Sequence, residues 1–181
     1  MMNKGLLFVI SGPSGTGKGT ICDELLKNEN NNLFLSISAT TREKRKDETE
    51  GVTYYYKTID EFKRMINNGE LLEHAVYNGN YYGTLRKNVE QMLYDGKNVL
   101  LEIEPQGALN VKSNFPEAIL MFVLPPSADE LKNRLINRGR ESEEQIEKRL
   151  NAAKWELEQA CKYSHIFVND NLDECVKEIE K

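Results

Sequence analysis

Short apolar runs alternate with helical patterns along most of the chain. Nearly unbroken apolar runs, which strands covered on both faces require, occupy residues 6–10, 33–38, 98–104, 118–124 and 165–169. Helical patterns fill the intervals, at residues 18–28, 87–95, 127–137, 143–162 and 171–180. Strands that alternate with helices in this way predict an α/β fold, in which helices wrap a parallel sheet.

The helical pattern at residues 143–162 has one apolar face. Its apolar positions recur at steps of four and three residues, at Ile146, Leu150, Ala153, Leu157 and Ala160. Side chains at this spacing form a single stripe along a helix. We expect the helix to pack against the rest of the molecule through that stripe.

The stretch from about residue 40 to 86 interrupts the alternation. It is rich in Thr, Tyr, Gly and charged residues, and it contains one short helical pattern, IDEFKRMINNG. A small lobe inserted into the sheet explains this stretch best. The length of 181 residues suits one compact domain that carries such a lobe.

Composition narrows the classes of partner. The net charge of -5 argues against a nucleic-acid partner. Residues 6–10 are too few to span a membrane and no signal-peptide pattern follows, so we expect a cytoplasmic protein with no membrane partner. The 3 cysteines lack metal-site spacing and the 2 histidines are too few for zinc, so no zinc site is expected.

The segment GPSGTGKGT follows the apolar run GLLFVI and nearly matches the phosphate-binding loop (P-loop) pattern G-x-x-x-x-G-K-[ST]. A strand, a glycine-rich turn, a lysine and a helix form the context that such a loop requires, whereas a chance glycine-rich turn needs none of it. Backbone N–H groups and the helix end would hold phosphate, and Lys18 would reach the β- and γ-phosphates. The expected ATP-binding residues here are Gly12, Pro13, Ser14, Gly15, Thr16, Gly17, Lys18, Gly19 and Thr20.

Gly19 departs from that pattern, which has a serine or threonine there to bind magnesium. Mg²⁺ readily keeps several waters, so it can sit on the nucleotide phosphates with little direct protein ligation. We therefore expect Mg²⁺ as the cofactor, bound mainly through phosphates and water. Thr20, one position late, and Glu102 are the two candidates for a direct ligand.

Three further segments are candidates for a phosphate acceptor site. SISATTREKR brings Arg42 and Arg45 close together, and guanidinium groups bind phosphate bidentately, although a solvated charged loop would look the same. NYYGT offers the hydroxyls of Tyr82 and Thr84, although the aromatic residues there would equally suit a core. LEIEPQG ends an apolar strand in carboxylates, at the edge of the sheet where ligands bind. An unpaired carboxylate there would be costly, so a ligand, metal or base is its expected partner.

Together these segments resemble guanylate kinases over nearly the whole chain. The matching motifs are GPSGTGKGT, S-x-T-T-R-x-x-R, EGVTYYY, NGNYYGT, LEIEPQG, LKNRLINRGRESEEQIEKRL and VND. The first alone indicates only a nucleotide-binding superfamily, whereas the set in this order is much more specific. The resemblance implies an enzyme that transfers phosphate from MgATP to GMP.

The resemblance also implies an architecture. It predicts a P-loop NTPase-type parallel sheet flanked by helices, with an inserted α+β GMP-binding lobe and a helical lid. In a single domain of residues 1–181, the lobe covers about 38–86 and the lid about 127–155. The core takes the remaining ranges, about 1–37, 87–126 and 156–181.

Residue roles in GMP binding follow from the same resemblance. The GMP phosphate would be held by Arg42, Arg45, Tyr54 and Tyr82. The guanine would be contacted by Ser38, Glu73 and Thr84, with Glu104 assisting. A carboxylate such as Glu73 accepts both the N1–H and the N2 amine of guanine, which adenine lacks. A site built on such bonds rejects the wrong base by roughly 10⁴.

The resemblance places further residues around the transferred phosphate and the adenine. The expected catalytic residues are Lys18, Arg134, Arg138 and Arg149, of which Arg134 and Arg138 would close from the lid and Arg149 would bridge toward the acceptor. Asn169 and Asp170 would border the adenine of ATP. Plain alternatives are ion pairs on glutamate-rich helices for the arginines, and a cap of the last helix for Asn169 and Asp170.

Two departures and two rival functions stay open at this point. Glu104 stands where the family usually has aspartate, and Pro105 beside it removes a donor and stiffens the turn. One rival is a scaffold domain that keeps the fold and binds proteins; the other is a kinase for another nucleoside monophosphate. Neither the use of deoxy-GMP nor the oligomeric state follows from the sequence.

Overall fold

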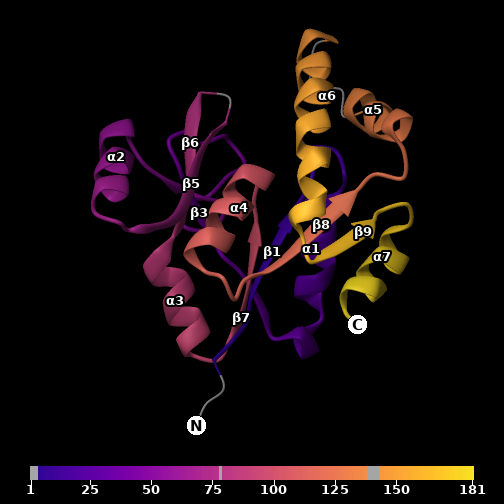
Figure 1. The fold of residues 1–181 in the computed structure, drawn as a ribbon. Coiled ribbons are helices and arrows are strands. Elements are labelled where there is room, and N and C mark those ends of the chain that lie inside the picture. Colours follow the sequence, from indigo (N-terminus) through magenta and orange to yellow (C-terminus); the bar gives the residue numbers. More distant parts are fainter. Residues whose placement is uncertain (1–3, 78, 138–142) are drawn as a thin grey trace.

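Five parallel strands form the central sheet, in the order β2-β7-β1-β8-β9. The structure, a computed structural model, describes residues 4–77, 79–137 and 143–181. The strands are β1 (Leu7–Ser11), β2 (Leu33–Leu35), β7 (Asn98–Glu102), β8 (Ile119–Leu124) and β9 (His165–Val168). Each overlaps one of the five apolar runs, so the predicted α/β fold is confirmed (Figure 1).

Helices cover both faces of this sheet, which explains why its strands are apolar throughout. On one face, Leu7 and Val9 of β1 pack with residues of α3 (Arg86–Tyr94) and α4 (Pro105–Asn114). On the other face, Ile10 packs with residues of α1 (Lys18–Lys27) and α7 (Leu172–Ile179). Alternate residues of one strand thus enter two separate apolar clusters.

The helix α4 was not predicted from the sequence. Pro105, which we expected to stiffen a turn, is its first residue, and Glu104 precedes it as the N-cap. A proline suits this position because the first N–H of a helix has no partner within the helix. The predicted strand at 98–104 therefore ends earlier, at Glu102.

A second, four-stranded sheet lies within the stretch that interrupts the alternation. Its order is β4-β3-β6-β5, and its strands are β3 (Ser38–Thr40), β4 (Tyr55–Tyr56), β5 (Leu71–Tyr77) and β6 (Asn80–Leu85). The helix α2 (Ile59–Asn67) covers it, and Phe62 packs with Ala39, Met65 and Leu71. The predicted strand at 33–38 is thus divided, because Ser38 begins a strand of this second sheet.

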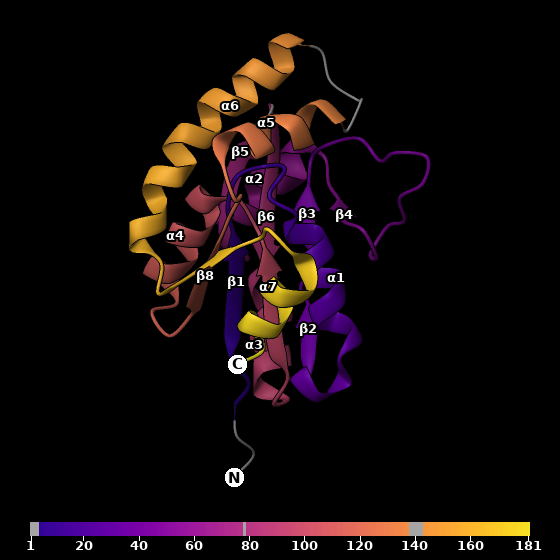
Figure 2. The ribbon, with the colours of Figure 1, turned by 90° about the vertical axis from the view of Figure 1, so that its right-hand side faces the viewer.

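Two helices lie above the central sheet, at the end of the molecule away from the N-terminus (Figures 1 and 2). They are α5 (Ala128–Asn137) and α6 (Glu143–Glu158), and the short helix η2 (Gln159–Lys162) continues α6. Ile146, Leu150 and Ala153 pack against α5, while Leu157 and Ala160 pack against the main core. The predicted apolar face is therefore confirmed. None of the described helices has the length and hydropathy that a membrane span requires.

Candidate active site

The glycine-rich loop lies at the centre of the sheet, between β1 and α1. The neighbours of β1 are β7 on one side and β8 on the other, so the loop stands where ligands of open parallel sheets bind. Gly17 precedes α1 with a φ of 88°, and a Cβ at this position would lie 2.5 Å from Asn169 Nδ2. Only glycine suits both constraints. Because no side chain caps α1, the N–H groups of its first turn remain available for an anion.

Lys18 is buried within this loop, with 8% of its surface exposed. Its ammonium group donates hydrogen bonds to the carbonyl oxygens of Gly12, at 2.6 Å, and Pro13, at 3.0 Å. Thr16 also donates to the Pro13 carbonyl, at 2.9 Å. The loop therefore keeps its shape through its own backbone, and it holds a positive charge where the sequence places the phosphates.

Glu102 ends β7 beside the first turn of α1. A Cβ at Gly19 would lie 3.6 and 3.8 Å from its two carboxylate oxygens. Among the described residues, no three His, Cys, Asp or Glu side chains come together as a metal site. A single exposed carboxylate next to a phosphate loop fits a magnesium ion that takes most of its ligands from the nucleotide and water.

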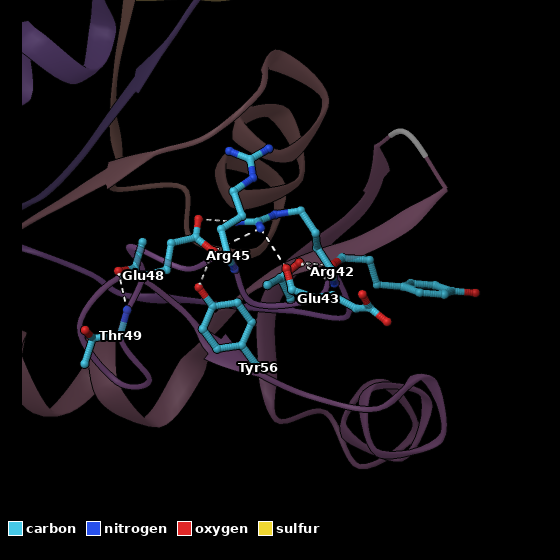
Figure 3. A network of polar contacts seen from close by, with 9 residues as sticks. Arg42, Glu43, Arg45, Glu48, Thr49 and Tyr56 are labelled. Carbon is cyan, nitrogen blue, oxygen red and sulfur yellow. Dashed lines mark hydrogen bonds and ion pairs between the residues drawn. The ribbon is translucent and has the colours of Figure 1, made fainter. Parts of the chain in front are cut away.

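Glu48 joins the two predicted phosphate-binding arginines (Figure 3). Its carboxylate accepts hydrogen bonds from Arg42 Nη1 at 3.0 Å and Nη2 at 2.5 Å, from the backbone N–H of Arg45 at 2.8 Å, and from the Tyr56 hydroxyl at 2.8 Å. These donors, led by Arg42, lower the pKa of Glu48 to about 2. The pair therefore stays ionised at any pH near neutrality.

The tyrosines predicted for this site gather around Arg42. Its guanidinium lies 5.4 Å from the centre of the Tyr54 ring, and the Tyr54 ring lies 6.0 Å from that of Tyr82. Tyr55, the middle residue of the YYY run, packs instead against the core of the second sheet. The structure thus brings Arg42, Tyr54 and Tyr82 together.

The predicted guanine contacts lie side by side on three neighbouring strands. Thr84 of β6 pairs with Ser38 of β3 on one side and with Glu73 of β5 on the other. The Thr84 hydroxyl donates to Glu73 at 2.8 Å, and both side chains are buried. Burial raises the pKa of Glu73 to about 7, although the bonds from Thr84 oppose the shift. A Cβ on Gly107 of α4 would lie 2.7 Å from the other Glu73 oxygen, so glycine makes room for the carboxylate there.

A cavity of about 200 Å³ connects these strands with the end of β7. Ser38, Tyr54, Glu73 and Tyr82 line it together with Glu102 and Glu104. Glu104 has a buried oxygen, Oε2, that has no hydrogen-bond partner among the described residues. Buried polar atoms are nearly always paired, so this atom points to a ligand in the cavity.

The two helices above the sheet bring arginines to the loop. Arg149 of α6 donates to the hydroxyl of Ser14 at 2.5 Å, which places it on the donor side of the site. Arg134 of α5 bonds Glu130 at 2.8 Å and the carbonyl oxygen of Asn169 at 3.1 Å, so the plain ion pair and a contact to the site coexist. Arg138 lies outside the described residues.

Asn169 is buried behind the loop, with 7% of its surface exposed. Its side chain donates to the carbonyl oxygen of Thr16 at 2.8 Å, and its own N–H donates to the carbonyl oxygen of Leu124 at 2.9 Å. Asp170 is exposed, and the cap of α7 is Asn171. The alternative that Asn169 and Asp170 cap this helix is therefore wrong by one or two positions.

Three residues of the site were not predicted from the sequence. Glu48 and Tyr56 belong to the arginine network described above, and Glu156 of α6 is buried with 9% of its surface exposed. Burial and the nearby Glu104 raise the pKa of Glu156 to about 7, while Lys18 and Arg149 oppose the shift. No local signal marked Glu156, because α6 carries several glutamates and only the packing of the helix shows that this one is buried.

A lysine-bearing loop at the centre of a parallel sheet, beside a cavity in an inserted lobe, is typical of P-loop kinases that act on a small acceptor. The family model described as guanylate kinase matches residues 4–181. A guanylate kinase of Oceanobacillus iheyensis is 50% identical over 177 residues, which are 98% of this chain and 85% of that protein. One of Bacillus subtilis is 49% identical over 180 residues, 99% of this chain and 88% of that protein.

A solved structure agrees with these relatives. The crystal structure of guanylate kinase from Anaplasma phagocytophilum matches with a TM-score of 0.79 and 34% identity, and the match covers 98% of this chain and 83% of that one. The chain therefore belongs to the guanylate kinase family. Members of this family are ATP:GMP phosphotransferases of purine nucleotide metabolism.

Proposed function

We propose that ATP binds at the loop of residues 12–20 and GMP in the cavity of the inserted lobe, so that the γ-phosphoryl group passes directly between them to give ADP and GDP. The observation that carries this proposal is the cavity itself. Its lining runs from Glu73 on the lobe to Glu102, whose carboxylate lies beside Gly19 of the loop. Two substrates bound at its two ends would meet where the charge of Lys18 lies.

In this proposal the chain divides into three parts. The core comprises about 1–37, 87–126 and 156–181, the GMP-binding lobe about 38–86, and the lid about 127–155. The lobe has its own sheet and apolar cluster, and α5 and α6 share a separate cluster. Parts with separate cores are able to move as units, and closure of the lobe and lid would exclude water from the transfer.

At the acceptor end, the phosphate of GMP is bound by Arg42, Arg45, Tyr54 and Tyr82. The base is read by Ser38, Glu73 and Thr84, with Glu104 at the edge of the cavity. Glu73 accepts from N1–H and the N2 amine of guanine. With adenine, the buried carboxylate would lose both donors and keep only Thr84.

At the donor end, the residues neutralise the charge that develops on the transferred group. Lys18 exchanges its loop carbonyls for phosphate oxygens, and the lid contributes Arg134, Arg138 and Arg149. Asn169 and Asp170 border the adenine. No strong general base is needed, because a phosphate monoester with a second pKa of about 6 is mostly ionised near neutral pH.

Mg²⁺ is the cofactor in this proposal, and it supplies charge neutralisation between the phosphates of ATP. Glu102 and Thr20 are the side chains available to hold it or its waters, and Gly19 offers none. The family assignment leaves deoxy-GMP open as a second acceptor. We propose that the enzyme acts in the cytoplasm, where both nucleotide substrates are available to it.

The readout of guanine by Glu73 is tested by titrating GMP, IMP and AMP calorimetrically. IMP keeps N1–H but lacks the N2 amine, and AMP lacks both donors. We expect affinity to fall in the order GMP, IMP, AMP. Equal affinity for the three nucleotides would contradict the assigned acceptor and favour a kinase for another nucleotide. Absence of binding by all three would favour the scaffold domain.

A further inference from the structure

The Glu48 carboxylate is the centre of the arginine network in Figure 3. It lies in a loop between β3 and β4, with 11% of its side-chain surface exposed, and 17% of the Arg42 side chain is exposed. Four donors from three residues meet its two oxygens. A carboxylate so fully paired is a fixed part of the loop, in contrast to an ordinary surface ion pair.

The contacts of Arg42 leave one edge of its guanidinium for a ligand. Nη1 donates to Glu48 and to the carbonyl oxygen of Glu43, at 2.8 Å, and Nη2 donates once to Glu48. Within the described part of the chain, these bonds use three of the five N–H groups of a guanidinium, and the Tyr82 hydroxyl also lies within reach of Arg42. The other two lie on Nε and Nη2, along the edge that suits a bidentate phosphate, and Tyr82, which is itself proposed to bind that phosphate, is the neighbour of this guanidinium.

Arg45 is held differently. Its backbone N–H donates to Glu48, while its guanidinium points away from that carboxylate (Figure 3). The same carboxylate thus fixes the side chain of one arginine and the main chain of the other. Tyr56 in turn holds Glu48 from the neighbouring strand β4.

We propose that Glu48, held by Tyr56, is the positioning residue of the acceptor-phosphate site, which presents the free edge of Arg42 and the backbone of Arg45 to the phosphate of a nucleoside monophosphate. The inference rests on the proposed function of Arg42 and Arg45. Pre-ordering matters here because an arginine side chain that must be ordered on binding loses rotamer entropy, and this loss weakens affinity.

A different role for Glu48 predicts the opposite effect. If the carboxylate stood in the place of the phosphate, the acceptor would have to displace it, and removal of its charge would tighten binding. If it positions Arg42, removal of its charge weakens binding. The direction of one measured change therefore separates the two roles.

The test is Glu48→Gln, with Glu50→Gln as the matched control. Glu50 lies in the same loop, and its carboxylate accepts from the backbone N–H of Tyr56 at 2.9 Å, so its variant makes the same charge change without removing a bond to Arg42. For Glu48→Gln we expect KM for GMP to rise roughly tenfold or more, with kcat within about threefold and KM for ATP unchanged. The control should stay within about twofold. An unchanged or lower KM for GMP in Glu48→Gln would overturn the proposal.

Guanosine lacks the phosphate, so its affinity should not depend on Glu48 unless the substitution damages the whole lobe. Guanosine binding therefore separates a positioning role from general damage. An NMR titration should give the same guanosine affinity for Glu48→Gln and the unaltered enzyme. Equal weakening of guanosine and GMP would mean that Glu48 only maintains the lobe, and the proposal would fall. If Glu48→Gln does not fold, Tyr56→Phe tests the same claim, with an expected rise of a few-fold in KM for GMP alone.

Measurements on the unaltered enzyme distinguish failure of this inference from failure of the proposed function. If it neither binds nor phosphorylates GMP, the function fails and the inference fails with it. If it does both and Glu48→Gln behaves in the same way, only the positioning role fails.

Discussion

The donor loop and the acceptor lobe hold a positive charge in two different ways. In the loop, Lys18 is held by the backbone carbonyls of Gly12 and Pro13, only six and five positions away along the chain. In the lobe, Arg42 is held by the ionised side chain of Glu48, which Tyr56 supports from another strand. The donor site is therefore a local backbone structure, whereas the acceptor site depends on side chains that the folded lobe brings together.

This difference has a chemical consequence. In the proposed function the loop reads phosphate, which every nucleotide carries. The lobe contains Glu73, whose pKa is raised to about 7 by burial, and in the proposed function it reads the base. We expect base specificity and the pH dependence of base binding to arise from the lobe, and most of the rate to arise from the loop and lid.

Removal of the Lys18 ammonium is the most direct way to break the donor side alone. We expect Lys18→Ala to lower kcat/KM by roughly 10²–10³, because a preorganised charge on the transferred group is lost. GMP affinity, measured by calorimetry, should stay unchanged. The exposed Lys27 on the same helix, which pairs with Glu24, supplies the control variant Lys27→Ala. Loss of GMP binding in Lys18→Ala would contradict the separation of the two sites.

The converse change is Glu73→Ala, which removes the buried acceptor of guanine. We expect kcat/KM for GMP to fall roughly 10²-fold, because two hydrogen bonds to a charged group are lost. ATP affinity should be unaffected. Glu70→Ala is the control, since Glu70 is exposed on the approach to the same strand and its carboxylate accepts from the side chain of Asn68, away from the cavity. A parallel loss of ATP binding would show that the sites are not independent.

Substitution of Asn169 tests whether this residue supports phosphate binding or base binding in the donor site. Because its side chain supports the loop at Thr16, Asn169→Ala should weaken ATP roughly tenfold. Inorganic tripolyphosphate, which has no base, should weaken by the same factor. Asn114→Ala is the matched control, because Asn114 also bonds a backbone carbonyl, that of Leu72, away from the loop. Weakening of ATP alone would instead place the action of Asn169 at the adenine.

The raised pKa of Glu73 predicts how guanosine affinity depends on pH. Guanine requires the ionised carboxylate, so affinity should rise about tenfold from pH 6 to pH 8 if the pKa is about 7. Guanosine is the suitable probe because it has no phosphate to titrate. In Glu73→Gln the rise should disappear. A rise of the same size in this variant would assign the dependence to another group.

The same pKa sets the sign of the effect of Glu73 on stability without ligand. Its ordinary pKa is 4.5, so between that value and about 7 the folded state keeps a proton that the unfolded chain has released. The contribution of Glu73 to the free energy of unfolding is therefore largest below this window and falls as pH rises through it. In denaturant titrations, the free energy of unfolding of the unaltered protein should therefore fall relative to that of Glu73→Gln as the pH rises from 4.5 to about 7.

The smallest effect is expected where the loop departs from the usual pattern. A Cβ at position 19 would lie in ordinary van der Waals contact with Glu102, at 3.6 Å, so Gly19→Ser should fold normally. Its hydroxyl would add one magnesium ligand to a site that already uses phosphates and water. We expect kcat to change by less than about threefold and the Mg²⁺ concentration for half-maximal rate to fall slightly. A large gain in kcat would mean that the loop lacks an essential ligand.

The parts of the fold that the sequence predicts are those with local causes. Five apolar runs gave five strands, and the loop is recognisable because its glycines and Lys18 lie within nine consecutive residues. The helix α4 escaped prediction because Pro105 was interpreted as a rigid turn, although proline also suits the first position of a helix.

The parts that could not be predicted are contacts between distant segments. Asn169 supports Thr16 across 153 positions, and no sequence pattern near either residue indicates this. Glu48 is only six positions from Arg42, but glutamate is common in charged loops, and nothing local marks it as paired. The resemblance to a family predicted the residues that would contact substrate. It did not predict the residues that hold those side chains in place.

In the proposed function, ATP and GMP meet between the loop and the lobe. The most direct test measures ADP formation from MgATP with each nucleoside monophosphate in turn, beside the Lys18→Ala variant. We predict rapid turnover with GMP, far slower turnover with the other ribonucleotides, and loss of GMP-dependent turnover in the variant. Turnover that prefers another base, or that survives the loss of Lys18, would contradict the account.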